Sequence, residues 1–275
     1  MRIAIIVSLC DLAGINIKEC LLELYPFKEL GEPFCRHPVY SLCSEFHDAR
    51  LYTVETDSIF CEGIDRRIGA DLFIFATKHQ SKSGIPSLSV HAPGNWAMAE
   101  LGGRDKELCV APASWLREGL LKLVELVRDR QGVEVVQECT HHGPYLEAPC
   151  MFIEIGPSEK EWRSREYGEI IAHAVHHLLA VHIPEREALL GIGGLHTAPN
   201  LCKVVLNTGY ALGHVCPKYM LEGLDEGMVR QAVERTSEPV ELIVVDWKGL
   251  GSHKEKVRSM LDSVGIRWLN YDKLY

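Results

Sequence analysis

Short apolar runs rich in β-branched residues recur along the chain and alternate with longer segments in which apolar residues return every three or four positions. Runs of four to eight apolar residues are typical of buried strands, and the wider spacing is typical of helices. The first run, Arg2–Leu9, precedes a helix that Asp11 can cap and that Pro26 ends. Strand, loop and helix in this order indicate an α/β fold.

The two patterns continue along the chain and predict one mixed sheet flanked by helices. No internal repeat, low-complexity segment or linker interrupts them, so a single domain over residues 1–275 is predicted. Within residues 26–66 the pattern is weak, and 39–43 and 51–55 are predicted as short strands of a hairpin. Further strands are predicted at 71–77, 87–90, 133–139, 151–155, 188–192, 204–207, 241–246 and 266–269, and further helices at 112–132, 158–182, 219–236 and 252–264.

Composition narrows the class of protein. The hydrophobic fraction of 47% and the charged fraction of 24% are ordinary for a soluble globular protein. No apolar run reaches the ~18 residues of a transmembrane helix, and Asp11 interrupts the first run too early for a signal peptide. The ten cysteines include no C-x-x-C pair, which favours reduced thiols in a cytoplasmic protein without a membrane partner.

The formal net charge of −9 argues against a protein that coats nucleic acid non-specifically, because such proteins carry a basic surface. A nucleic-acid substrate held by a local basic patch remains compatible with this charge. Basic residues do occur in polar loops near the ends of predicted strands, at Lys78, Lys82, Arg104 and Lys106. They either keep these loops soluble or contact phosphates.

Histidines lie at the ends of predicted strands, where α/β folds collect reactive groups. His79 and His91 each follow a strand, and His141 and His142 together follow the next one. Adjacent residues of a strand point to opposite faces, so both of these rings can share one site only if the backbone bends. The Gly143-Pro144 turn supplies such a bend. The sequence therefore predicts a site formed by these four histidines.

Two further histidines and one carboxylate extend the predicted site. Gly193 and Gly194 precede His196, and glycines there let a ligand approach the backbone closely. The segment does not match the G-x-G-x-x-G template of a dinucleotide site. His214 also follows a glycine. Glu154 interrupts an apolar strand, so its carboxylate must be paired, solvated or functional.

Imidazoles together with a carboxylate suit zinc with an open position for water, which serves ester or amide hydrolysis. A metal-free site is the alternative, with a neutral histidine as general base and a second histidine or backbone amides stabilising the oxyanion. No G-x-S-x-G elbow or cysteine-protease signature is present, which argues against a covalent nucleophile. Catalytic roles are predicted for His79, His141, His142 and Glu154, and metal ligation for His91, His142, His196 and His214.

Six motifs taken together resemble the archaeal and plant type of D-aminoacyl-tRNA deacylase. Thr-His-His-Gly-Pro and Gly-Gly-x-His-x-Ala-Pro are the specific pair, whereas either one alone would be weak. Residues 26–70 carry no matching motif. The motifs run in order through most of the chain, at 78–84, 89–95, 140–144, 152–156, 191–199 and 213–214.

The resemblance implies hydrolysis of the ester that joins a D-amino acid to tRNA. It also implies a zinc requirement, with one or two ions, and a monomeric fold similar to phosphorylase and peptidyl-tRNA hydrolase domains. The expected partner is tRNA charged with a D-amino acid, without an obligate protein partner. Contacts with this substrate are predicted for Lys78, Lys82, Asn95, Arg104, Gly193 and Gly194.

Two other functions remain open at this point. One is a zinc-dependent peptidase or amidohydrolase of similar fold that acts on a small peptide. The other is a non-catalytic protein that binds tRNA or a nucleotide and whose histidines are structural.

Overall fold

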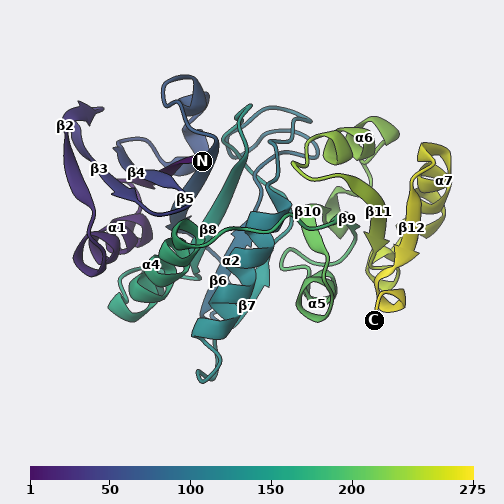
Figure 1. Ribbon diagram of the computed structural model, residues 1–275. Coiled ribbons are helices and arrows are strands. Elements are labelled where there is room, and N and C mark those ends of the chain that lie inside the picture. Colours follow the sequence, from purple (N-terminus) through teal and green to yellow (C-terminus); the bar gives the residue numbers. More distant parts are fainter.

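The computed structural model describes residues 1–275, which form two β-sheets lying side by side with seven α-helices around them (Figure 1). The larger sheet is mixed and has the strand order β2-β3-β4-β1-β5-β8-β6-β7. Its strands are β1 (Arg2–Ser8), β2 (Lys28–Phe34), β3 (His37–Cys43), β4 (Asp48–Val54), β5 (Leu72–Lys78), β6 (Ser87–His91), β7 (Glu134–Gln137) and β8 (Cys150–Gly156). The α/β class is thereby confirmed.

The smaller sheet is entirely parallel, and in Figure 1 it occupies the green and yellow C-terminal part of the chain. Its strand order is β10-β9-β11-β12. The strands are β9 (Ala188–Ile192), β10 (Ala211–Cys216), β11 (Val240–Val245) and β12 (Arg267–Asn270). The prediction of one sheet was wrong, because the hydrophobic pattern identifies strands but not which strands pair.

Helices cover the sheets. On the larger sheet α4 lies between α1 and α2 and packs against both (Figure 1). The carboxylate of Asp11 caps α1 as predicted, since its Oδ1 accepts the backbone N–H groups of Ala13 and Gly14. None of the helices combines the length and the apolar character needed to cross a bilayer. The helices are α1 (Leu12–Leu24), α2 (Ala113–Leu126), α3 (Glu159–Trp162), α4 (Arg165–Ala180), α5 (Pro199–Asn207), α6 (Glu226–Glu234) and α7 (Lys254–Val264).

Two predicted elements differ from the structure. Residues 204–207, predicted as a strand, form the end of α5, which begins at Pro199 and buries Leu201, Val204 and Val205 on one face. The single helix predicted over 158–182 is divided into α3 and α4. The break is held by the side chain of Asn16, whose Nδ2 donates to the carbonyls of Trp162 and Ser164 at 3.0 and 2.8 Å.

The two sheets meet along the segment that follows β7. In this segment the backbone N–H of Cys139 donates to the carbonyl of His196, and that of Thr140 donates to the carbonyl of Val215 in β10. The indole of Trp96 donates to the same Val215 carbonyl at 3.1 Å. One apolar cluster contains side chains from both sheets, which is compatible with the predicted single domain. The predicted likeness to phosphorylase and peptidyl-tRNA hydrolase domains stays a prediction.

Candidate active site

The junction of the sheets brings together histidines from four separate segments. His79 follows β5, His91 ends β6, His141 and His142 follow β7, and His196 follows β9. The ring centroid of His141 lies 4.3 Å from that of His91, 4.2 Å from that of His142 and 4.4 Å from that of His196. His79 joins them with its ring 5.7 Å from that of His196. The predicted convergence of distant histidines is therefore present in the fold.

The bend at Gly143 allows both adjacent histidines to face the same site. His142 adopts a left-handed backbone conformation with φ 46°, which turns its ring toward that of His141 instead of away from it. A Cβ atom on Gly143 would lie 2.2 Å from the backbone nitrogen of Gly103. Only glycine fits there, because the chain passes so close to a neighbouring loop.

Backbone carbonyls orient three of these imidazoles. The Nδ1 atoms of His91, His141 and His142 lie 3.2, 2.8 and 2.6 Å from the carbonyl oxygens of Ala92, Cys139 and Gly143. Each carbonyl accepts an Nδ1–H, so each Nε2 keeps its lone pair. This is the arrangement in which histidine binds a metal through Nε2. One ligand atom from each of the three rings can be chosen so that all three atoms lie within 4.8 Å of one another.

Glu154 lies beneath these rings on β8 and is buried between β5 and β6. Its Oε1 accepts the hydroxyl of Thr77 at 2.8 Å. Its Oε2 accepts no hydrogen bond and lies 3.5 Å from His91 Nε2 and 3.7 Å from His79 Nδ1. The Nε2 of His91 is likewise buried without a hydrogen-bond partner. Buried polar atoms are rarely left unpaired, so this pair of atoms indicates a place for an ion or a polar ligand.

Glu138 is the central carboxylate of the site, and the sequence analysis missed it. Its Oε2 lies 2.9 Å from His196 Nε2, and its Oε1 lies 3.2 Å from His79 Nδ1. Burial disfavours the charged carboxylate, but the hydrogen bonds from His196 and His79 outweigh burial and hold the pKa of Glu138 well below its ordinary value. Unlike Glu154, which interrupts an apolar strand, Glu138 follows the polar residue Gln137 at the end of β7, so the same signal is absent.

The histidines divide into two electrostatic groups. Burial, together with the neighbouring histidines, lowers the pKa of His141 well below its ordinary value and that of His142 to about 4. Burial also opposes protonation of His79 and His196. Contacts with Glu138 nevertheless raise the pKa of His79, and contacts with Cys139 and Glu138 raise that of His196 to about 10. Neutral imidazoles suitable for metal binding thus lie beside an imidazolium–carboxylate pair.

His196 also has a second set of contacts through its other nitrogen. Its Nδ1 lies 3.0 Å from the hydroxyl of Tyr219 and 3.4 Å from the thiol sulfur of Cys139. The sequence analysis did not identify Tyr219 or Cys139 as site residues, because an exposed tyrosine and a buried cysteine are both ordinary and no motif surrounds them.

A cavity of about 390 Å³ opens beside the histidines. Lys78 lines it, and its Nζ pairs with Asp57 at 3.1 Å. Ser58, Ile59 and Leu101 line the cavity as well. A cavity of this size suits a small organic ligand.

Lys78 alone among the residues predicted to bind substrate lines this cavity. Lys82 is exposed on its loop. Asn95 is buried and donates to the carbonyl of Gly102 at 2.9 Å, so it shapes the loop that carries Arg104. The Arg104 guanidinium lies over the ring of Tyr145 at 4.2 Å.

Gly193 and Gly194 hold the loop that carries His196. Both have positive φ values, and a Cβ on Gly193 would lie 2.9 Å from the carbonyl oxygen of Asp246. The carbonyl of Gly194 accepts the backbone N–H of Lys218. Neither glycine lines the cavity.

His214 is not brought to the cluster. Its Nε2 lies 3.0 Å from the carbonyls of Cys109 and Arg235, and its Nδ1 lies 3.0 Å from the hydroxyl oxygen of Thr140. Both ring nitrogens are thus engaged inside the fold, and burial lowers the pKa of His214 to about 4. The ring supports Thr140, which directly precedes His141, and the ligand set proposed below omits His214.

A protein-family model described as D-aminoacyl-tRNA deacylase matches residues 67–269. The chain belongs to the D-aminoacyl-tRNA deacylase family. The resemblance noted in the sequence motifs is therefore confirmed. The match begins near the point where the sequence motifs begin, and residues 1–66 lie outside it.

Relatives of this family extend the similarity over almost the whole chain. The D-aminoacyl-tRNA deacylase of Thermococcus kodakarensis is 38% identical over 268 residues, which cover 94% of this chain and 96% of that protein. The deacylase of Methanosarcina mazei is 37% identical and covers 99% of this chain and 93% of its own length. A crystal structure of a conserved protein of unknown function is 28% identical, covers 100% of this chain and 96% of its own, and superposes with a TM-score of 0.88.

Proposed function

We propose that this protein hydrolyses the ester bond between a D-amino acid and tRNA, with a zinc ion at the histidine cluster. As a member of the D-aminoacyl-tRNA deacylase family, it is a hydrolase that acts on the aminoacyl-tRNA ester. Selection of the D form and the use of zinc are the parts that we propose. The peptidase and the non-catalytic binding protein are not favoured by the family relationship.

One observation carries the zinc proposal: two buried atoms, His91 Nε2 and Glu154 Oε2, face each other without a hydrogen bond. A cation bound to His91 Nε2, with a water molecule of that cation beside Glu154 Oε2, would give both atoms a partner. The proposed ligands are His91, His141 and His142, whose Nδ1 atoms are tied to carbonyls. Three imidazole nitrogen ligands suit zinc with one position open.

A zinc ion bound there would polarise a carbonyl oxygen and make a water molecule nucleophilic near neutral pH. The residues of the chain supply the rest. Glu154 holds a carboxylate oxygen toward the histidines, and the Thr77 hydroxyl fixes the other oxygen. This free oxygen is the candidate acceptor for a proton from water.

His196 and Glu138 form a second functional pair next to the proposed ligands. The imidazolium of His196 is held by Glu138, and it is a candidate donor to the ribose oxygen that leaves when the ester is cut. Lys78 lines the cavity with its ammonium group paired to Asp57, and from there it is a candidate contact for the terminal phosphate of the substrate.

Hydrolysis of D-Tyr-tRNA and L-Tyr-tRNA, measured with and without a chelator, tests the proposal. Release of D-tyrosine only, abolished by the chelator and restored by zinc, is the expected result. Activity that survives complete metal removal would contradict the role of zinc. Equal hydrolysis of both esters would contradict D selectivity. Peptide cleavage without ester hydrolysis, or tRNA binding without turnover, would favour one of the two other functions.

A further inference from the structure

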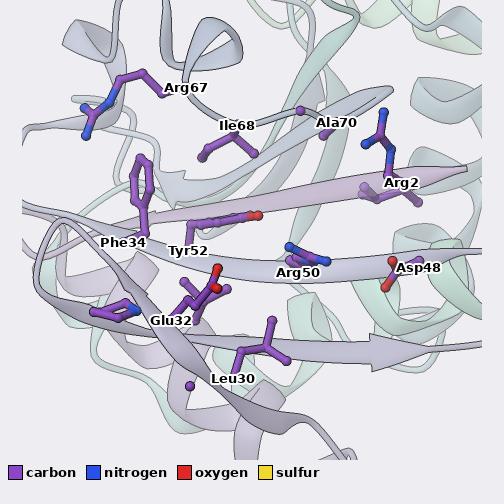
Figure 2. Close-up of a pocket in the computed structure, with 15 residues that line it drawn as sticks. Arg2, Leu30, Glu32, Phe34, Asp48, Arg50, Tyr52, Arg67, Ile68 and Ala70 are labelled. Atoms are coloured by element: carbon purple, nitrogen blue, oxygen red, sulfur yellow. The ribbon is translucent and has the colours of Figure 1, made fainter.

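A groove of about 740 Å³ lies in the N-terminal part of the molecule, outside the histidine site. Figure 2 shows Arg50 and Tyr52 of β4 and Arg2 of β1 along its floor, with Phe34 and Arg67 toward one end. The walls are formed by the β2 strand and by residues 67–70. Most of the residues that line it precede position 67, where the family model begins to match.

The groove carries arginines that the fold leaves available. Arg50 forms no ion pair, and its guanidinium donates no hydrogen bond within the chain; it is exposed. Arg67 has no carboxylate partner either, since it donates to the sulfur of Cys35 at 3.1 Å and lies over the ring of Phe34 at 4.7 Å. Arg2 has only a long, exposed contact of 4.0 Å with Asp71. Exposed pairs of this kind are weak.

The charge of the groove differs in sign from that of the whole chain. Its lining holds three arginines and two carboxylates, Glu32 and Asp48, and neither carboxylate pairs with an arginine of the groove. The complete chain has 29 basic and 38 acidic residues. A local excess of guanidinium groups on an acidic protein indicates a site for an anion, because arginine binds phosphate oxygens well.

One segment connects the groove with the catalytic cavity. Residues 57–59 line the cavity and residues 67–70 line the groove, and between them the chain forms two short 3-10 turns, Ser58–Phe60 and Ile64–Arg66. Strand β1 runs between the same two places, from Arg2 in the groove toward Asp11 in the cavity. A seven-residue strand of this kind spans roughly 20 Å.

We infer that this groove binds backbone phosphates of the acceptor arm of tRNA while the charged 3′ end occupies the catalytic cavity. The inference rests on the proposed function, which places an aminoacylated 3′ end at the histidines. The acceptor arm continues from that end as a polyanion over a distance of this order, and the groove supplies unpaired guanidinium groups to receive it. Contacts of this type position an RNA without reading its sequence.

Arg50→Gln tests the inference, because it removes a charge at the centre of the groove. The Arg50 guanidinium has no partner within the chain, so the substitution leaves no other group unpaired. We expect the KM for D-Tyr-tRNA to rise about five-fold, and the slope of log KM against log salt concentration to become smaller by about one unit. Arg66→Gln is the matched control, since Arg66 is exposed on the same connecting segment but does not line the groove. The control should keep the KM and salt slope of the unmodified protein.

Three outcomes would count against the inference or against the proposed function. If Arg50→Gln and Arg66→Gln give the same KM and salt slope, the groove does not bind tRNA and the inference is overturned. A loss of activity by Arg50→Gln on a short substrate, the D-tyrosyl ester of adenosine, would also overturn it, because that ester cannot reach the groove. Failure of the unmodified protein to hydrolyse D-Tyr-tRNA would instead refute the proposed function.

Discussion

The orientation of three histidines in the site is set by carbonyl groups close to them in sequence. His91, His141 and His142 each use Nδ1 locally, on residues one or two positions away. Their Nε2 atoms are therefore directed by the local backbone and remain oriented even without a ligand. Such preorganisation lowers the cost of binding, because little rotamer freedom is lost when the ligand arrives.

His214 offers a test of protonation at the scale of one residue. Burial lowers its pKa to about 4 in the folded state, against an ordinary value of 6.5. As the pH falls below 6.5, the unfolded chain takes up a proton that the folded chain does not, so stability is lost between about pH 6.5 and pH 4. The shift corresponds to about 3 kcal/mol in total, of which about 2 kcal/mol is lost by pH 5.

Urea unfolding at pH 7 and pH 5 measures this loss. His214→Gln keeps a donor for the carbonyls of Cys109 and Arg235 but cannot take up a proton. The unmodified protein should therefore lose about 2 kcal/mol more than the variant between the two pH values. An equal loss in both proteins would show that His214 does not titrate as described.

The sequence analysis identified most of the residues that the structure brings together, and the roles that it assigned to them stay predictions. A histidine at a strand end is visible in a sequence, and five such histidines do converge here. Glu138 was missed because it occupies the end of a predicted strand, where a polar residue is unremarkable. His214 shows the opposite case, since a glycine-histidine pair gives no indication of whether the ring faces a cavity or backbone carbonyls.

At the scale of elements, the break between α3 and α4 depends on one side chain from α1. Asn16 is almost completely buried, and its amide donates to the carbonyls of Trp162 and Ser164. Gly168 of α4 lies against the same side chain, where a Cβ would be 2.4 Å from Asn16 Oδ1. The amide thus fixes how α4 begins and how closely it approaches α1.

Asn16→Ala should lower the free energy of unfolding by roughly 2 kcal/mol, because two partly buried carbonyls lose their donor. Chemical denaturation measures this change. Asn207→Ala is the control: Asn207 is exposed, donates only to the carbonyl of Lys203 within α5, and should change stability by less than about 0.5 kcal/mol. If the two substitutions changed the free energy of unfolding equally, Asn16 would not hold the break between α3 and α4.

The errors in element prediction have physical causes that a single sequence does not reveal. Strand β2 was not predicted because five of its seven residues are exposed, so it lacks the alternation that a half-buried strand shows. The last residues of α5 are apolar and short enough to suit either a strand or a helix, and Pro199 decides in favour of a helix. The break between α3 and α4 is held by Asn16, which lies about 150 positions earlier in the sequence, beyond the reach of any local pattern.

At the scale of the molecule, the site is shared by the two sheets. His79, His91 and Glu154 belong to the larger sheet, whereas His196 comes with β9 of the smaller sheet. The two sheets are joined next to the site, where the Val215 carbonyl accepts hydrogen bonds from the indole N–H of Trp96 and the backbone N–H of Thr140. The complete site therefore exists only when both sheets are folded and joined.

Zinc binding at this junction should consequently stabilise the whole protein. A ligand that binds only the folded state adds about 2.7 kcal/mol at a free concentration 100 times its Kd. For a chain of this size that corresponds to a rise in Tm of roughly 5–10 °C. Thermal unfolding of metal-free protein, with zinc added and then removed by a chelator, measures the shift.

His142→Ala removes one proposed ligand and should abolish this rise in Tm together with most of the bound zinc. His182→Ala is the matched control, because His182 is an exposed histidine after α4, far in sequence from the cluster. It should keep both the rise in Tm and the metal content. If His142→Ala retained them as well, zinc would be bound elsewhere, and the unpaired atoms of His91 and Glu154 would require another ligand.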